Sequence, residues 1–165
     1  MTIGVETLSG DDLAQGLDAV ARLRIAVFRS YPYLYDGSLD YERSYLEKFA
    51  AAEGAIIAVA RDGDEVVGAA TGCPLAAEHQ AFSQPLRSLG HDVNDIFYCA
   101  ESVLLPQYRG RGLGHRFFDL REARSRLWRH RNAEAGFVDR GAVIARTGTD
   151  GGAAAVDHEL LVQAA

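Results

Sequence analysis

The sequence predicts an α/β fold in which helices cover a mixed sheet, with the elements in the order β-α-α-β-β-β-α. Three observations lead to this prediction. Short β-rich runs have apolar side chains at alternate positions or in continuous stretches, as strands do. Two segments carry apolar residues at the steps of three and four that are typical of helices. An Asp-Gly pair, which is typical of a hairpin turn, separates two of the β-rich runs. The chain has 165 residues and 48% hydrophobic residues, enough for one domain with a buried core.

The first third of the chain predicts one strand and two helices. Residues 2–8 alternate between apolar and polar side chains, and Ser9 with Asp12 has the spacing of a capping box that starts a helix. The apolar positions of that first helix are Leu13, Leu17, Val20, Leu23 and Val27. A second helix is expected from Leu39 to about Ala52. The side chains expected on its apolar face are Tyr41, Tyr45 and Phe49.

The middle of the chain predicts three strands and a further helix. Two β-rich runs flank the Asp62-Gly63 turn in residues 55–72, and residues 76–90 are expected to be irregular or helical. Residues 95–106 are apolar on both faces, which is typical of a central strand. A proline ends this strand, because proline has no N–H to donate. The next helix is expected to begin at residues 112–113.

The charge is unevenly distributed along the chain. The formal net charge is -6, yet residues 109–131 contain eight Arg against only Asp119 and Glu122. An acidic protein without a lysine-rich run is not expected to bind nucleic acid, and its basic cluster favours a compact polyanionic small molecule. A solvated helix face is favoured over phosphate contact for Arg116, Arg121 and Arg124.

Several other classes of protein are disfavoured. No apolar run reaches the roughly 18 residues of a membrane span, so we expect no membrane partner. The N-terminus lacks the basic and apolar regions of a signal peptide, so we expect a cytoplasmic protein. Cys73 and Cys99 are expected to be reduced and buried. No histidine lies near them at a zinc-like spacing, so no metal site is expected.

The stretch LLPQYRGRGLGHRFF, residues 104–118, places three glycines at alternate positions between a strand and a helix. Such a junction presents free N–H groups and a helix dipole to an anion, and glycine lets the ligand approach the backbone. A nucleoside triphosphatase loop does not fit, because the only lysine is Lys48. A dinucleotide fingerprint does not fit either, because its last glycine would be His115. A tight structural turn is the plain alternative.

The junction also carries Arg109, Gly112 and Gly114 in the spacing R-x-x-G-x-G, after the strand sequence ESVLLP. This pattern, in this order of elements, resembles the acyl-CoA-binding motif of the GNAT superfamily of acyltransferases. The resemblance is most specific between Phe97 and about Arg124, and it implies a GNAT-like fold with acetyl-CoA as co-substrate. The residues it implies for acyl-CoA binding are Val103, Leu104, Leu105, Arg109, Gly110, Arg111, Gly112, Leu113, Gly114 and His115.

Acyl transfer to an amine requires a base for the amine proton and a donor for the developing oxyanion. Glu101 is the candidate base, because it is the only carboxylate in the apolar run FYCAESVLL, where burial would raise its pKa. The resemblance implies the same role for a glutamate on this strand. The alternative is a structural ion pair with Arg22 or Arg24. Ser102 is a second catalytic candidate, as an orienting group. The N–H groups expected to bind the thioester oxygen are those of Val103 or Leu105.

The resemblance further implies that the link between the first two helices lines the acceptor pocket. The substrate-binding candidates in this link are Tyr31, Tyr33, Tyr35 and Asp36. Aromatic rings with hydroxyl groups suit a small amphipathic amine, although plain packing accounts for them equally well. Asp36 is a candidate for holding the positive charge of the amine.

The C-terminal part departs from the pattern of the family. We expect a GNAT-like acyl-CoA-binding domain over residues 1–128 and an atypical segment over 129–165, with a short strand at 141–146 and a helix at 153–164 but no closing strands. No tyrosine follows Tyr108, so the frequent general acid of the family has no counterpart. We hypothesise a truncated or replaced C-terminus, which would expose a strand edge and favour a homodimer.

The sequence therefore predicts an N-acetyltransferase. It would move the acetyl group of acetyl-CoA to a primary amine of a small molecule or peptide, by direct attack in a ternary complex. The alternative is a truncated, non-catalytic GNAT-like protein that only binds acyl-CoA weakly.

Overall fold

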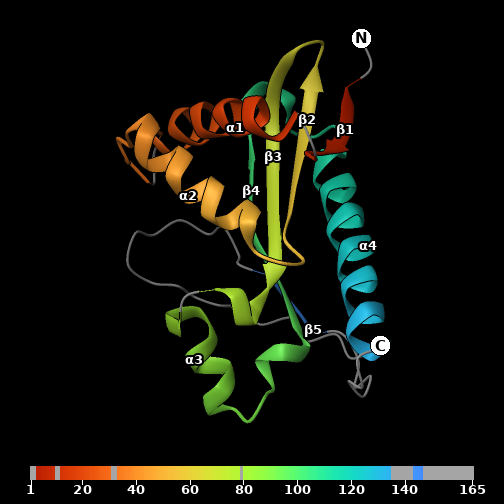
Figure 1. Cartoon of the computed structure of the whole chain (residues 1–165). Coiled ribbons are helices and arrows are strands. Elements are labelled where there is room, and N and C mark those ends of the chain that lie inside the picture. Colours follow the sequence, from red (N-terminus) through yellow and green to blue (C-terminus); the bar gives the residue numbers. More distant parts are fainter. Residues whose placement is uncertain (1–2, 10–11, 31–32, 79, 135–142, 147–165) are drawn as a thin grey trace.

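The computed structural model describes residues 3–9, 12–30, 33–78, 80–134 and 143–146. Figure 1 shows the elements. The strands are β1 (Gly4–Thr7), β2 (Ile56–Asp62), β3 (Glu65–Pro74), β4 (Ile96–Leu104) and β5 (Val143–Arg146). The helices are α1 (Asp12–Phe28), α2 (Leu39–Ala51), α3 (Gln80–Ser88) and α4 (Leu113–Glu134). The predicted order of elements is confirmed, and residues 76–90 contain one helix, α3.

The sheet has the strand order β1-β2-β3-β4-β5. The first four strands pair antiparallel, whereas β5 lies parallel to β4. The turn between β2 and β3 contains Gly63, whose φ of 60° is easily adopted by glycine. The predicted hairpin at Asp62-Gly63 and the central position of β4 are therefore confirmed, and the fold is a mixed α/β fold.

Helices cover both faces of this sheet (Figure 1). The face under α1 and α2 contains the larger apolar cluster, which includes Val20, Leu46, Val59 and Val103. The opposite face packs against α4 through smaller clusters that include Val67 and Phe117. Among the helices of the described residues, none is both long and apolar enough to cross a membrane.

Helix α2 turns two of its three predicted aromatic residues, Tyr45 and Phe49, toward the core. Its buried residues are Glu42, Leu46 and Phe49, whereas Tyr41 is 62% exposed. The residue before the helix, Ser38, is its N-cap, and its hydroxyl accepts a hydrogen bond from the Tyr41 N–H. The prediction is therefore wrong for Tyr41 alone, and the Glu42 carboxylate occupies the buried position one residue further along.

A bulge interrupts the pairing of β3 with β4. Thr71 pairs with Glu101, but Cys73 pairs with Tyr98, so β4 carries one extra residue over this interval. Ile96 and Tyr98 before the bulge and Val103 after it all belong to the cluster under α1 and α2. The bulge therefore turns Glu101 toward these helices. Strict alternation from Tyr98 would turn it to the other face.

The C-terminal prediction is tested only in part. Helix α4 continues through residue 128, so the expected domain boundary at 128/129 falls inside a helix. The short strand expected at 141–146 is present as β5, which pairs with residues Ile96–Cys99 of β4. The helix expected at 153–164 and the closing strands lie outside the described residues. The predicted burial of Cys73 and Cys99 is confirmed, and neither forms a disulfide within the described residues.

Candidate functional site

Within the described residues, the central strand β4 has one free edge beyond the bulge. Pairing with β5 covers Ile96–Cys99, and no other strand of the described residues pairs with Ala100–Leu104 on that side. An unpaired stretch of strand offers main-chain N–H and C=O groups to a ligand that lies along it as an additional strand would. This edge leads directly to the glycine-rich junction before α4.

The register decides which backbone groups face this free edge. The N–H of Leu105 donates to the Val67 carbonyl of β3 (3.0 Å), so it is already used within the fold. In an antiparallel pair, alternate residues point both backbone groups to the same side, so Val103 also faces β3. The backbone groups of Ser102 and Leu104 face the free edge instead. The expected role of the Leu105 and Val103 N–H groups is therefore wrong.

The junction between β4 and α4 carries unpaired N–H groups. The Arg116 N–H donates to the Gly112 carbonyl (3.4 Å), so Gly112 immediately precedes the first turn of α4. The N–H groups of residues 110–115 have no acceptor within the described part of the chain. Five of these six residues are exposed, the exception being the buried Leu113. The junction is thus open to solvent and suited to an anion.

Two glycines of the junction have backbone angles that favour glycine, and the space beside all three is open. Gly110 and Gly112 have φ angles of 73° and 76°, in the left-handed region. A Cβ built at Gly110, Gly112 or Gly114 meets no atom within 4 Å, so the space beside all three is empty. A structural turn explains the two positive φ angles, but it does not require glycine at position 114.

Side chains hold the junction in place from one side. The Tyr108 hydroxyl donates to Asp62 Oδ2 (2.9 Å), which ties the junction to the hairpin of β2 and β3. The Arg111 guanidinium lies 5.2 Å from the centre of the Tyr108 ring and donates to the Gln107 carbonyl. Arg109 is exposed and forms no ion pair within the described residues. Its guanidinium is therefore available to an anion at the junction.

The arginines further along α4 bind carbonyl groups of the sheet and its loops. Arg116 donates to the Ile3 carbonyl (2.9 Å), and Arg124 donates to the Gly54 carbonyl (3.2 Å). Arg121 is buried and donates to the carbonyl groups of Thr71 (3.4 Å) and Glu101 (3.2 Å). The expectation of a solvated face is wrong for Arg121, because its cation lies against the backbone of β3 and β4.

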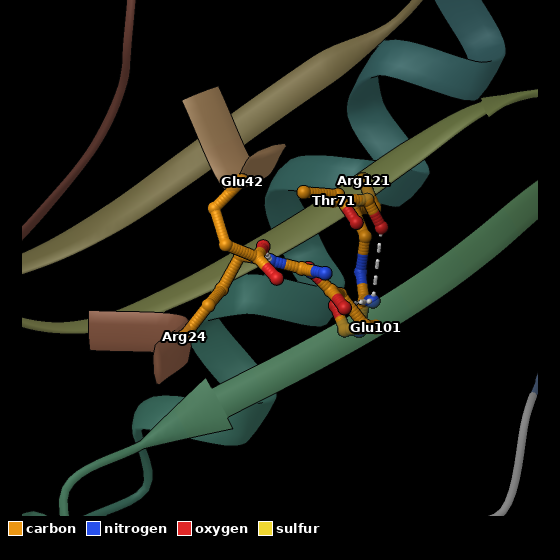
Figure 2. A network of polar contacts seen from close by, with 5 residues as sticks. All are labelled: Arg24, Glu42, Thr71, Glu101 and Arg121. Atoms are coloured by element: carbon orange, nitrogen blue, oxygen red, sulfur yellow. Dashed lines mark hydrogen bonds and ion pairs between the residues drawn. The ribbon is translucent and has the colours of Figure 1, made fainter. Parts of the chain in front are cut away.

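Glu101 lies in a buried network of charged groups (Figure 2). Arg24 of α1 donates from Nη1 to Glu101 Oε1, and from Nε to Glu42 Oε2 (2.5 Å). Arg24 and Glu42 are only 8% and 1% exposed, whereas the Glu101 side chain is 20% exposed. The predicted ion pair with Arg24 is therefore present. Arg22 pairs with Asp18 instead.

The surroundings of Glu101 favour its protonated form. Burial raises the pKa of the Glu101 carboxyl, the Arg24 cation opposes this, and the charges of Glu42 and Glu78 raise the pKa further. The Arg24 guanidinium lies over the rings of Phe28 (5.1 Å) and Tyr45 (4.8 Å). Burial likewise raises the pKa of Tyr45, so this phenol stays protonated. A proton-binding carboxylate with limited access to solvent is suited to general base chemistry.

Ser102 does not share this environment. It follows Glu101 in the strand after the bulge, so its side chain lies on the opposite face of the sheet. The structure thus does not bring the Ser102 hydroxyl to the Glu101 carboxylate. Thr71, which pairs with Glu101 across the strands, has a buried hydroxyl without a hydrogen-bond partner among the described residues.

The link between α1 and α2 places some acceptor candidates beside the network. Tyr33 packs edge-on against Phe28, with ring centres 5.1 Å apart. Burial and the negative charge of Glu42 raise the pKa of the Tyr35 hydroxyl. Asp36 forms an exposed ion pair with Arg29 (2.6 Å). Tyr31 lies outside the described residues.

The sequence prediction missed Glu42 and the burial of Arg121. The spacing of Glu42, Leu46 and Phe49, four and then three residues apart, places them on one face of the helix. This spacing could have predicted the burial of Glu42. Nothing in the local sequence distinguishes Arg121 from its exposed neighbours. No group of three or more potential metal ligands of the His, Cys, Asp and Glu types occurs within the described ranges.

No protein-family model and no curated protein matches the chain in sequence. Solved structures do match its fold. A GNAT family acetyltransferase from Staphylococcus aureus has a TM-score of 0.54 at 14% identity, covering 94% of this chain and 93% of that one. The ribosomal-protein-alanine N-acetyltransferase from Brucella melitensis has a TM-score of 0.54 at 15% identity, covering 74% of this chain and 67% of that one.

A third match is AAC(6')-Iy in complex with the bisubstrate analogue CoA-S-monomethyl-acetylneamine. Its TM-score is 0.53 at 15% identity, and the match covers 91% of this chain and 83% of that one. At these identities the likeness concerns the fold. The chain has the fold of the GNAT acetyltransferases, as its sequence predicts.

Proposed function

We propose that the protein is an acetyl-CoA-dependent N-acetyltransferase that acts on a primary amine of a small molecule or peptide. The observation that carries this proposal is the run of N–H groups over residues 110–115, which have no acceptor among the described residues and lie at the start of α4. Beside them lies the edge of β4 that no described strand covers. Free amides at a helix N-terminus suit a diphosphate. An unpaired strand edge suits the amide groups of a pantetheine arm.

The proposed binding mode uses both features. The diphosphate of acetyl-CoA lies over the junction, with Arg109 adding a positive charge. The pantetheine arm runs along β4 and bonds to the backbone of Ser102 and Leu104, which face the free edge. The remaining residues of the proposed acyl-CoA site are Gly110, Arg111, Gly112, Leu113, Gly114 and His115. The thioester then lies where β4 and β5 cease to pair.

The chemistry is a direct transfer. The amine nitrogen attacks the thioester carbonyl carbon, the carbon–sulfur bond breaks, and CoA leaves as a thiolate that takes up a proton. Glu101 accepts the proton that the amine loses, directly or through a water molecule. Tyr33 and Tyr35 of the α1–α2 link line the acceptor side. A simple ion pair in place of a base is the competing role for Glu101, and the observed contact with Arg24 favours it.

A non-catalytic acyl-CoA-binding protein is therefore the second candidate function. Titration calorimetry with acetyl-CoA tests the binding that both candidates require. Acetyl-CoA at 100 times its dissociation constant should stabilise the fold by about 2.7 kcal/mol. Release of CoA thiol in the presence of a panel of primary amines then separates the two. Binding without turnover of any amine supports the second candidate, and no binding to a folded protein contradicts both.

A further inference from the structure

Glu42 is a buried carboxylate to which the proposed chemistry assigns no role. It lies on α2 with 1% of its surface exposed, and it accepts a hydrogen bond from Arg24 Nε. A buried ion pair does not in general stabilise a protein more than apolar residues of the same volume would. Stability alone therefore does not account for a charged group at this position.

The geometry links Glu42 to Glu101 through one guanidinium group. Arginine presents its donors in a rigid planar fork, so the direction of Nη1 is set once Nε is fixed. Glu42 binds Nε, and Nη1 then faces Glu101 (Figure 2). The rings of Phe28 and Tyr45 hold the same guanidinium. Arg121 fixes the main chain of Glu101 by donating to its carbonyl.

We propose that Glu42 is a positioning residue, which acts through Arg24 to orient the Glu101 carboxylate and to share its counter-ion. This inference rests on the proposed function, in which Glu101 is the base. Glu42 also acts electrostatically on the acceptor loop, because burial and the negative charge of Glu42 raise the pKa of the Tyr35 hydroxyl. Glu42 therefore acts on Glu101 through Arg24 and on Tyr35 through its charge.

The charged and titratable groups that face Glu101 come from several elements. They are Arg24 on α1, Glu42 and Tyr45 on α2, Glu78 after β3, and Arg121 on α4. Glu42→Gln keeps an oxygen that accepts from Arg24 Nε but removes a negative charge, so Glu101 should lose its proton at lower pH. Arg24→Lys keeps the positive charge but lacks the fork, so the bond to Glu101 weakens and Glu101 should lose its proton at higher pH.

The first experiment follows the Glu101 carboxyl carbon by NMR titration of the full chain labelled at glutamate Cδ. Glu101→Gln identifies the signal. The midpoint should move down in Glu42→Gln and up in Arg24→Lys. The matched control is Glu47→Gln, an exposed carboxylate on the same helix, which should leave the midpoint unchanged. Unchanged midpoints in both test variants, or shifts in the same direction, overturn the proposal.

The second experiment measures the pH profile of acetyl transfer to the amine of the panel with the highest turnover. The acidic limb of kcat should move as the NMR midpoints do, and Glu42→Ala should lower kcat by roughly a hundredfold, as misplacement of a reacting group does. The KM for acetyl-CoA should stay unchanged. An unaltered kcat in folded Glu42→Ala overturns the proposal. Failure of the proposed function would instead appear in the wild type, as an absence of acetyl-CoA binding or as binding without turnover of any amine.

Discussion

The junction before α4 and the network around Glu101 differ in how far their polar and charged groups are exposed and paired. The junction is exposed and offers backbone N–H groups that have no acceptor within the described residues. The network is buried, and Arg24 bonds to both of its carboxylates, Glu42 and Glu101. The junction can therefore bind an anionic ligand. In the network, by contrast, the carboxylates are already paired with the Arg24 cation. Substitutions at the junction should therefore mainly affect acetyl-CoA binding, whereas substitutions in the network should mainly affect stability and catalysis.

The largest loss of stability is expected when Arg24, the common partner of Glu42 and Glu101, is replaced. Arg24→Met leaves Glu42 and Glu101 without a counter-ion, and it should lower the free energy of unfolding by about 3–5 kcal/mol. Urea denaturation measures this. Arg22→Met is the matched control on the same helix: its side chain is 68% exposed, so removing its pair with Asp18 should cost at most about 1 kcal/mol. Equal effects of the two substitutions would contradict the special position of Arg24.

The next effect should appear in catalysis and not in binding. Glu101→Gln removes the proposed base while keeping the shape of the side chain. It should lower kcat by about a hundredfold or more. The affinity for acetyl-CoA, measured by calorimetry, should remain that of the wild type. A parallel loss of affinity and turnover would assign Glu101 a structural role.

Two glycine substitutions at the junction should have opposite effects on stability. Gly112→Ala forces a Cβ into the left-handed region and should cost about 1–2 kcal/mol of unfolding free energy. Gly114→Ala lies in the first turn of α4 without a positive φ, and it should stabilise the helix by up to about 1 kcal/mol. Both should weaken acetyl-CoA binding, because the new methyl group occupies the open space beside the amides.

Thermal unfolding in the presence and absence of acetyl-CoA reports both effects in one experiment. Undiminished stabilisation by acetyl-CoA in folded Gly114→Ala would place the diphosphate elsewhere.

The smallest effect is a change in stability with pH. Burial raises the pKa of Glu101 in the folded state, so the folded protein binds this proton more tightly than the unfolded chain does. Its contribution to stability is therefore present at low pH and is lost as the pH rises through the folded pKa. Compared with the wild type, Glu101→Gln should become relatively more stable as the pH rises above about 4, the ordinary pKa of a glutamate. Urea denaturation across this range tests the sign.

The accuracy of the sequence prediction differs between the same two regions. The strand, the glycines and the helix that form the junction are adjacent in the chain, so local patterns predict them. The network joins α1, α2, β4 and α4, and its members are far apart in sequence. Arg24 was one of two predicted partners of Glu101, but Glu42 was missed because the tyrosines of α2 suggested another buried face.

The backbone roles in β4 illustrate the same difference at the level of single residues. The sequence places a ligand along this strand, but it does not tell which residues face the free edge. The pairing with β3 decides that Ser102 and Leu104 do so and that Val103 and Leu105 do not. The bulge beside Gly72 then turns the Glu101 side chain toward α1 and α2. Register and bulge are properties of two strands together.

By itself, the sequence determined the order of the elements, the hairpin, the central strand and the glycine junction, because turn chemistry and apolar periodicity act over a few neighbouring residues. Tertiary structure alone decided which carboxylates share Arg24, which arginine of α4 is buried and which edge of β4 is free. The physical reason is that burial and strand pairing bring together groups from distant segments. The free energy of a charge depends on those groups and not on its neighbours in the chain.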